Sequence, residues 1–484
     1  MTLFGNKIRL RFAPSPTGFL HLGNLRSALF GYLLTKSWHG KFILRLEDTD
    51  QKREIEGSLE KLIDILGWIG VEFDEGPHTT GNYGPYIQSE RLSIYKKYID
   101  QLINTKKAYR CFCSEERLTD MRLAQEARKE APRYDRLCRN LSETEIEEKL
   151  KIGENFVIRQ KLPLEGELTV HDEIRGDIKF KLKDLDDHVL IKSDGVPTYH
   201  FANIVDDHLM KITHVTRGDE WLPSFPKNIL LYDAFGWKAP KYIHLPLILN
   251  KTGGKLSKRQ GDVFVEQYRD KGYLPEAIIN FCSLLGWHGK DDKEIYTLKE
   301  LEKSFTQEGI GASPAVFDIE KLDYYNAHYI RQKSLSELTE LCKPFLEKAG
   351  HKTKDKKRLK DFVALAQDRI KKLEDIVELT SFLFNLGHYD KELLAWKTLS
   401  VENAKNNLRE IIPELLKVDN ANWNKDYLET NILNWIKNNN KKNGDYLWPV
   451  RVALTGLKNS PSPFEVASAL GKEESLRRLE KSLK

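Results

Sequence analysis

The chain has 484 residues, of which 77 are lysine or arginine and 72 are aspartate or glutamate, so its formal net charge is only +5. At about 100–200 residues per domain, this length predicts several domains and more than one core. Charged residues make up 31% of the chain and hydrophobic residues 40%, which excludes a wholly disordered protein. The five cysteines exclude a disulfide scaffold and indicate the reducing cytoplasm.

Neither a membrane segment nor a secretory signal is expected. No apolar run approaches the roughly 18–20 residues that a membrane-spanning helix needs. The first residues lack the apolar core of a signal peptide, and Arg9 and Arg11 follow at once. The small net charge does not by itself indicate nucleic acid, so any anionic partner must be met by locally grouped basic residues.

The first 70 residues have the pattern of a strand–helix–strand unit. Residues 7–13 alternate and predict a strand, which a proline-rich turn ends. Apolar residues recur at helical spacing over 25–33, residues 41–47 predict the next strand, and residues 55–66 predict another helix. The short joins imply a parallel sheet with a right-handed crossover.

The rest of the chain divides into segments with different sequence patterns. Residues 110–187 are highly charged and bear cysteines, and we interpret them as an insertion between two halves of one sheet domain. The α/β pattern is expected to resume at residues 189–192 and to run to a last strand at 243–249. From Leu335 onward the apolar spacing is helical, which predicts an all-α half.

The segment between the first strand and the first helix carries the strongest chemical signal. It reads Arg-Phe-Ala-Pro-Ser-Pro-Thr-Gly-Phe-Leu-His-Leu-Gly-Asn from Arg11 to Asn24. Ligands of parallel sheets bind at the carboxyl ends of strands, and a helix N-terminus offers N–H groups to phosphate. His21 can donate a hydrogen bond without a full charge, and Gly23 permits close approach of the backbone.

A second segment reads Lys-Leu-Ser-Lys-Arg from Lys255 to Arg259 and follows the last strand of the interrupted domain. A basic pentad alone is usually a solvated loop. In this position, however, it could close over a triphosphate. Two lysines and an arginine would then offset the charge that builds on a pyrophosphate leaving group.

With these two segments the chain resembles the class I aminoacyl-tRNA synthetases, because residues 21–24 look like their HIGH motif and residues 255–259 like their KMSKS motif. More narrowly, it resembles the bacterial glutamyl-tRNA synthetases. This likeness extends along almost the whole chain, through further segments at residues 46–50, 194–203, 205–208, 217–221, 317–322 and 451–456.

The resemblance implies a Rossmann-like parallel-sheet catalytic domain, split by an inserted α+β domain and followed by an all-α anticodon-binding half. A monomer is expected. The implied boundaries are 1–109 and 188–250 for the two catalytic halves, 110–187 for the inserted acceptor-binding domain, 251–333 for the KLSKR loop and a stem-contact domain, and 334–386 and 387–484 for the two parts of the anticodon-binding half.

The resemblance also implies a two-step reaction that uses ATP with Mg²⁺. The α-carboxylate of L-glutamate attacks the α-phosphate, which gives glutamyl-adenylate and pyrophosphate. The 2′-OH of the terminal adenosine of tRNA(Glu) then attacks the activated carbonyl. Positioning and electrostatic stabilisation supply the catalysis, and no protein nucleophile is required.

Residue roles carry over from the family in three groups. The catalytic residues are His21, Lys255 and Lys258. The ATP site adds Gly23, Asn24, Ser257, Arg259 and Glu220. The glutamate site comprises Arg11, Ala13, Ser15, Glu47, Tyr199, Asn203 and Arg217.

Within the glutamate site, Arg11 and Tyr199 are expected at the γ-carboxylate and Arg217 at the α-carboxylate, because guanidinium groups pair bidentately with carboxylates. Glu47 is expected to hold the substrate ammonium. Outside this motif context, a surface charge for Arg11 and a salt bridge or helix cap for Glu47 would be the simpler interpretations.

Cys111, Cys113 and Cys138 follow a spacing that resembles the zinc site in the inserted domain of some glutamyl-tRNA synthetases. In those proteins a fourth ligand falls two positions after the last cysteine, which here is Asn140, a poor zinc ligand. A zinc ion would therefore need a fourth ligand from elsewhere. The alternative is a group of reduced cysteines without a metal.

The implied macromolecular partner is tRNA, which the family binds with the inserted domain and the helical half. Residues 352–360 carry a run of basic side chains and are a candidate phosphate patch. Trp423, Trp435 and Trp448 could stack on bases, but tryptophans at helical spacing more often belong to a core.

Other functions stay open beside the leading one. A glutaminyl-type synthetase typically ends in β-barrels, and the shortened paralogue that modifies a tRNA base lacks the C-terminal half that is present here. An inactive tRNA-binding regulator is disfavoured because His21, Lys255 and Lys258 are intact. The sequence does not indicate whether tRNA(Gln) is also charged.

Overall fold

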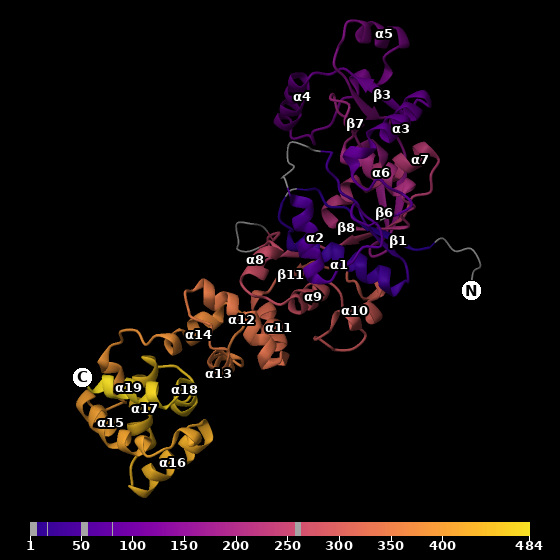
Figure 1. The fold of residues 1–484 in the computed structure, drawn as a ribbon. Helices are drawn as coiled ribbons and strands as arrows, with labels where there is room; N and C mark the ends of the chain where they lie inside the picture. Colours follow the sequence, from indigo (N-terminus) through magenta and orange to yellow (C-terminus); the bar gives the residue numbers. More distant parts are fainter. Residues whose placement is uncertain (1–6, 17, 50–56, 80, 257–262) are drawn as a thin grey trace. The chain divides into compact units, whose positions relative to one another are not determined.

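A computed structural model describes residues 7–16, 18–49, 57–79, 81–256 and 263–484 (Figure 1). The chain forms two compact units, one of Met1–Tyr268 with Ile278–Ile319 and the other of Arg269–Ala277 with Glu320–Lys484. Among the described residues, no helix combines the length and the apolar character that crossing a bilayer requires.

The first unit begins with the expected strand–helix–strand arrangement. Strands β1 (Arg9–Phe12) and β2 (Lys41–Leu44) pair in parallel, and α1 (Leu22–Ser37) connects them. Helix α1 is buried on nearly all sides. It lies close to the strands because Gly31 has no side chain: a Cβ atom there would lie 3.0 Å from Phe42 and Thr216.

A second sheet of the same unit has the strand order β6-β5-β9-β8. Strands β8 (His214–Gly218) and β9 (Lys241–Leu245) pair in parallel, and β5 (Glu167–Asp172) joins β9 at its edge. Strand β6 (Gly176–Lys181) completes an antiparallel hairpin with β5. This hairpin comes from the segment interpreted as an insertion. It reaches the parallel strands because Val170 packs into a core that also contains Tyr242.

The third sheet is antiparallel and joins the inserted segment to the strand that follows it. Strands β3 (Ala108–Cys111), β4 (Val157–Gln160) and β7 (Val189–Ile191) form an antiparallel sheet with β4 in the centre. The strand expected at residues 189–192 is present as β7, and it pairs with β4, a strand of the segment interpreted as an insertion. A three-residue apolar run shows only that a strand is buried, and it carries no information about its partner.

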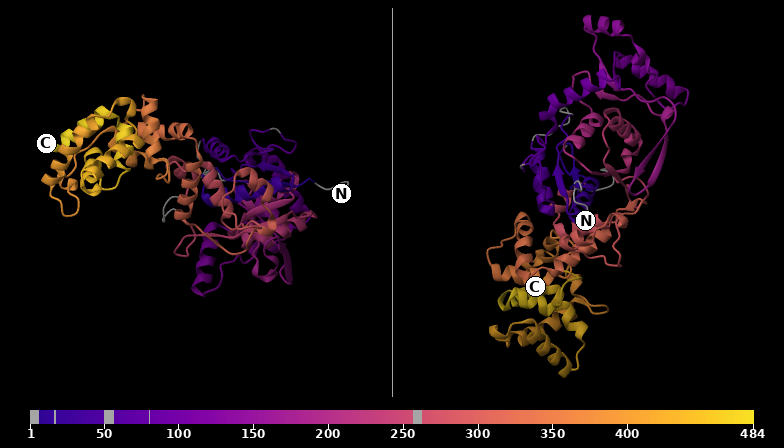
Figure 2. Two further views of the ribbon diagram at one scale, coloured as in Figure 1. Left: turned by 90° about the horizontal axis from the view of Figure 1, so that it is seen from below. Right: turned by 90° about the vertical axis from the view of Figure 1, so that its right-hand side faces the viewer.

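Further helices complete the first unit (Figures 1 and 2). They are α2 (Ser58–Ile69), α3 (Leu92–Asn104), α4 (Glu115–Ala127), α5 (Glu143–Lys151), α6 (Tyr199–Leu209), α7 (Phe225–Phe235) and α10 (Leu298–Ser304). A short parallel pair joins β10 (Ile248–Leu249) to β11 (Ala315–Val316). The boundary between the two units falls inside α8 (Val265–Asp270) and α9 (Pro275–Leu284).

The second unit contains helices and no strand, and the structure describes all of its residues, so the predicted all-α half is confirmed. The helices are α11 (Ile319–Gln332), α12 (Leu335–Lys348), α13 (Lys356–Ala366), α14 (Asp375–Phe384), α15 (Val401–Leu416), α16 (Lys425–Asn438), α17 (Asn443–Thr455), α18 (Pro463–Leu470) and α19 (Lys472–Leu483). Capping side chains set several of their starts: Ser334, Asp355, Ser400 and Ser462 each accept a backbone N–H from the third residue on.

The tryptophans of this unit contribute to its core. Trp423 is 8% exposed and donates its indole N–H to the carbonyl of Ala467 at 2.8 Å. Trp448 donates to the carbonyl of Leu393, also at 2.8 Å. Both side chains pack in the main apolar cluster of the helical unit, so the core interpretation is confirmed for them.

Candidate active site

A buried cluster of opposite charges lies beside the carboxyl ends of β1 and β2. Arg11 Nε donates to Asp207 Oδ1 at 3.0 Å, and Arg45 Nη1 donates to the same oxygen at 2.6 Å. Arg45 Nη2 donates to Glu47 Oε1 at 3.0 Å. All four side chains belong to buried residues. Loss of Asp207 would leave Arg11 without its ion pair, and loss of Arg45 would do the same to Glu47, so the cluster is an interdependent unit.

Asn203 joins this cluster from α6. Its Oδ1 accepts hydrogen bonds from Arg11 Nη2 and Arg45 Nη2, both at 3.3 Å, whereas its Nδ2 has no partner among the described residues. Burial raises the pKa of Glu47 against the opposing influence of Arg45 and Arg11. Burial also acts to raise the pKa of Asp207, but Arg11 and Arg45 outweigh it and hold that pKa below its ordinary value.

Arg217, at the end of β8, is a buried cation that forms no ion pair with any residue that the structure describes. It is 5% exposed, and among the described residues none of its three guanidinium nitrogens has a hydrogen-bond partner. Its guanidinium carbon lies 4.7 Å from the centre of the Trp221 ring and 5.8 Å from that of Tyr199. Because an unpaired buried charge is costly, these donors are set to receive an anion from outside the protein.

Tyr199 and Trp221 form an aromatic wall beside Arg217. Their ring centres are 4.6 Å apart. Burial raises the pKa of Tyr199, so its hydroxyl is neutral at physiological pH and can donate a hydrogen bond to an anion. The site therefore combines two arginines, a neutral hydroxyl and the buried carboxylate of Glu47, a set that can bind a small molecule with carboxylate and ammonium groups.

His21 is the N-cap of α1 and has a defined tautomer. Its Nδ1 accepts a hydrogen bond from the backbone N–H of Gly23 at 3.0 Å, so the proton of the neutral ring resides on Nε2 as a donor. A side chain at position 23 would crowd this ring, because a Cβ atom there would lie 3.3 Å from His21 Nδ1. Asn24 is exposed in the first turn of the same helix.

Lys255 and Glu220, both expected at the nucleotide, lie near each other. Lys255 is exposed, and its Nζ is 3.8 Å from Glu220 Oε1. The loop before Lys255 is shaped by Asn250, whose Oδ1 accepts two backbone N–H groups of the same turn at 2.7 and 3.3 Å. Outside the described residues lie Ser257, Lys258 and Arg259.

The structure thus brings Arg11, Glu47 and Asn203 into one cluster and sets Tyr199 against Arg217. Ala13 is half-buried and Ser15 exposed on the segment that follows β1. Sequence reasoning missed three residues that complete the site: Arg45, Asp207 and Trp221. The sequence does contain a signal for Arg45, which is the one charged residue between Phe42 and Leu46 in an otherwise apolar segment.

The neighbouring carboxylate on α6 has a different task. Asp206 accepts hydrogen bonds from Gln88 Nε2 at 2.9 Å, from Arg91 Nε at 2.7 Å and from the Tyr95 hydroxyl at 2.7 Å. These bonds fix α6 to the region of α3, and the adjacent Asp207 is thereby held toward the charge cluster.

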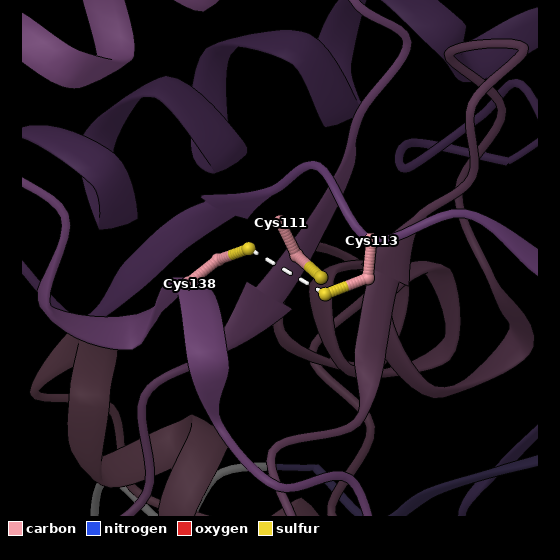
Figure 3. Close-up of side chains that lie close together, drawn as sticks. All are labelled: Cys111, Cys113 and Cys138. Carbon is pink, nitrogen blue, oxygen red and sulfur yellow. Dashed lines mark hydrogen bonds between the residues drawn. The ribbon is translucent and has the colours of Figure 1, made fainter. Parts of the chain in front are cut away.

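The three cysteines of the insertion lie together, as Figure 3 shows. Their sulfur atoms are within 4.8 Å of one another. The Tyr134 oxygen lies 3.2 Å from Cys111 Sγ and 3.5 Å from Cys113 Sγ. The hydrogen bond between the two thiols lowers the pKa of Cys111 and raises that of Cys138, so the pair shares one proton. Three sulfurs at this separation could hold one zinc ion between them.

Comparison with known proteins gives a consistent result. Residues 7–324 match the family described as tRNA synthetases class I (E and Q), catalytic domain, and residues 337–483 match an anticodon binding domain. A glutamate–tRNA ligase of Clostridium botulinum (strain Hall) is 46% identical over 98% of this chain and 97% of its own, and one of Clostridium tetani is 47% identical at the same coverage. The solved structure of a glutamate tRNA ligase from Elizabethkingia meningosepticum CCUG26117, in complex with its amino acid, has a TM-score of 0.90 and 37% identity, and the match covers 99% of each chain.

Proposed function

The chain belongs to the class I tRNA synthetases of the glutamate and glutamine type, and we propose that it joins L-glutamate to the 3′-terminal adenosine of tRNA(Glu) with ATP. The observation that carries this proposal is Arg217, a buried guanidinium whose donors are all unpaired among the described residues. A second buried arginine, Arg11, belongs to the charge cluster with Arg45 and Asp207. Two guanidinium groups suit a substrate with two carboxylates.

The substrate binds between these groups. Arg217 takes the α-carboxylate, and Arg11 with the Tyr199 hydroxyl takes the γ-carboxylate. Arg11 uses Nε and Nη2 within the cluster, which leaves its Nη1 donors for the substrate. Glu47 accepts from Arg45 through Oε1, which leaves Oε2 for the ammonium group. Ala13, Ser15 and Asn203 line the same site.

ATP binds where α1 begins and where the Lys255 loop approaches. The Nε2 proton of His21 donates to a phosphate oxygen, Gly23 allows the triphosphate to approach the start of α1 closely, and Asn24 is exposed beside it in the first turn. Glu220 binds the nucleoside part, and Mg²⁺ accompanies the phosphates as part of the substrate. Lys255 and Lys258, with Ser257 and Arg259, stabilise the charge that develops on pyrophosphate as the glutamate carboxylate attacks the α-phosphate.

In the second step the ribose 2′-OH of the tRNA attacks the adenylate carbonyl. Residues 110–187 receive the acceptor end, and residues 334–386 and 387–484 receive the anticodon. The basic side chains between residues 352 and 360 are all exposed and form a patch for tRNA phosphates. The protein acts as a monomer in the cytoplasm, where translation takes place.

The charging reaction tests this function with separated tRNA(Glu) and tRNA(Gln), labelled glutamate and ATP. We expect the wild-type protein to attach glutamate to tRNA(Glu). Attachment to tRNA(Gln) as well would identify a non-discriminating enzyme. Failure to charge either tRNA, with tRNA binding retained, would instead favour an inactive tRNA-binding regulator.

We also propose that the cysteine cluster binds one structural zinc ion through Cys111, Cys113 and Cys138, with the Tyr134 oxygen as the fourth ligand. Protein made in zinc-supplemented medium is expected to carry about one zinc per chain, measured by mass spectrometry of the metal. Cys113→Ser should lose most of it, because three-sulfur coordination is broken. Cys342→Ser is the matched control, since Cys342 is a buried thiol of the helical unit. Equal zinc in both variants, or none in the wild type, would contradict the site.

A further inference from the structure

One face of the paired strands β8 and β9 carries polar groups whose hydrogen-bonding capacity is unused. Arg217 on β8 lies directly opposite His244 on β9 in the parallel register, so the two side chains project from the same face. His244 is 0% exposed. Its Nε2, like the guanidinium nitrogens of Arg217, has no partner among the described residues. The proposed function uses Arg217 but gives His244 no role.

A buried carboxylate fixes the orientation and the tautomer of His244. Asp172 Oδ2 accepts from His244 Nδ1 at 2.8 Å and from the His244 backbone N–H at 3.1 Å. Asp172 Oδ1 accepts from the backbone N–H groups of Ile174 and Arg175, each at 3.0 Å. Because Nδ1 carries the ring proton and donates it in a hydrogen bond to Asp172, Nε2 is unprotonated and can accept a hydrogen bond. Burial lowers the pKa of His244, so the ring is neutral at physiological pH.

Aromatic rings hold the imidazole in place from its sides. The ring centre of Phe225 is 4.9 Å from that of His244, and the Tyr242 ring stacks on it at 5.9 Å. The ring therefore has little freedom to turn its Nε2 away from the face that it shares with Arg217. Held by these rings and by Asp172, it presents one fixed acceptor to that face.

We infer that His244 is a positioning residue for Arg217: when substrate binds, Nε2 accepts one guanidinium N–H and fixes the edge that Arg217 presents to the α-carboxylate. A neutral acceptor suits this task. A carboxylate in the same place would neutralise Arg217 and weaken its attraction for the substrate, as an imidazole does not. The inference rests on the proposed function, in which Arg217 binds glutamate.

Two substitutions distinguish the roles of the two ring nitrogens of His244. His244→Asn retains an amide N–H near the Nδ1 position for Asp172 and removes the acceptor at Nε2. His244→Gln places an amide oxygen near the Nε2 position. In ATP–pyrophosphate exchange with tRNA present, we expect H244N to raise the KM for glutamate about tenfold, since a hydrogen bond to a charged group is lost. The KM for ATP should stay unchanged, and H244Q should restore the KM for glutamate to within about threefold of wild type.

His214→Asn is the matched control. Like His244, His214 is a buried histidine, but it lies on β8, its Nδ1 is 2.9 Å from the Thr213 hydroxyl and its ring packs on Trp38. It should leave both KM values unchanged. A wild-type KM for glutamate in H244N, or equal increases for glutamate and ATP, would overturn the inference. Absence of glutamate-dependent exchange in the wild type would refute the proposed function instead.

A second measurement needs no substitution and so covers the case in which H244N does not fold. In a crystal structure of the full chain with bound glutamate, we expect a guanidinium nitrogen of Arg217 about 2.7–3.2 Å from His244 Nε2. With glutamate bound at Arg217, a separation beyond about 3.5 Å would overturn the inference. Glutamate bound elsewhere, without contact to Arg217, would refute the proposed site on which the inference rests.

Discussion

Arg217→Met is expected to make the protein more stable and to abolish its use of glutamate. Methionine fills the apolar space beside Trp221 without a buried charge, so the free energy of unfolding should rise by about 1–2 kcal/mol. Glutamate-dependent ATP–pyrophosphate exchange should fall by about 10²–10³-fold, because two charge-assisted hydrogen bonds to the α-carboxylate are lost. Urea unfolding and the exchange assay measure the two effects on the same preparation.

Arg9→Met provides the contrast. Arg9 is also a buried arginine, but it is paired: Nη1 and Nη2 donate to the two carboxylate oxygens of Glu75 at 2.7 and 2.9 Å. Its loss should cost about 3–5 kcal/mol, since the buried Glu75 loses its cationic partner and keeps the hydrogen bond from the Tyr86 hydroxyl. Destabilisation of R217M to the same extent would show that Arg217 has a structural role, which would contradict the assignment to the substrate.

Asp207→Asn is expected to be among the most destabilising single changes in the first unit. Asp207 neutralises Arg11 and Arg45 together, and both arginines are buried. Replacing the carboxylate with an amide leaves two cations with less compensation, so we expect a loss of about 3–5 kcal/mol in urea unfolding at pH 7. The glutamate KM should rise as well, because Arg11 loses the anchor that orients it.

The pH dependence of this loss has a definite sign. The pKa of Asp207 in the folded protein is held below its ordinary value, so its contribution to stability is present above the pKa of the unfolded state and is lost as the pH falls through the folded-state pKa. The difference between wild type and D207N should therefore be largest near neutral pH and shrink below about pH 4.

A surface carboxylate serves as the control for Asp207. Asp100 pairs with Lys96 on α3 at 2.9 Å, and both side chains are at least half exposed. Asp100→Asn should change stability by less than about 1 kcal/mol. If D207N cost no more than D100N, the buried cluster would not be the interdependent unit described above.

An element of this fold is predictable where its own segment of sequence determines it, and is not predictable where a distant segment does. Helix α7 (Phe225–Phe235) and the all-α second unit follow from apolar spacing, which each segment carries in its own sequence. The pairing of β7 with β4 cannot be predicted in this way, since a short apolar strand could join any buried sheet. The attachment of β5 to β9 is likewise set by packing between residues that are distant in sequence.

The same distinction holds for the site. The arrangement of His21 and Gly23 lies within three residues, so the motif itself contains it. The pairing of Arg45 with Asp207 spans 162 positions, and nothing near Arg45 identifies its partner. In the cysteine cluster, the sequence directs attention to Asn140, whereas the hydroxyl that reaches the sulfurs belongs to Tyr134, which the fold brings into the cluster.

The most direct measurement is ATP–pyrophosphate exchange by wild type and R217M, with tRNA(Glu) present and either glutamate or glutamine as the amino acid. Two buried arginines and a buried glutamate predict exchange with glutamate in the wild type, little with glutamine, and almost none in R217M. Exchange that requires glutamine rather than glutamate, or that survives undiminished in R217M, would contradict the account of this site.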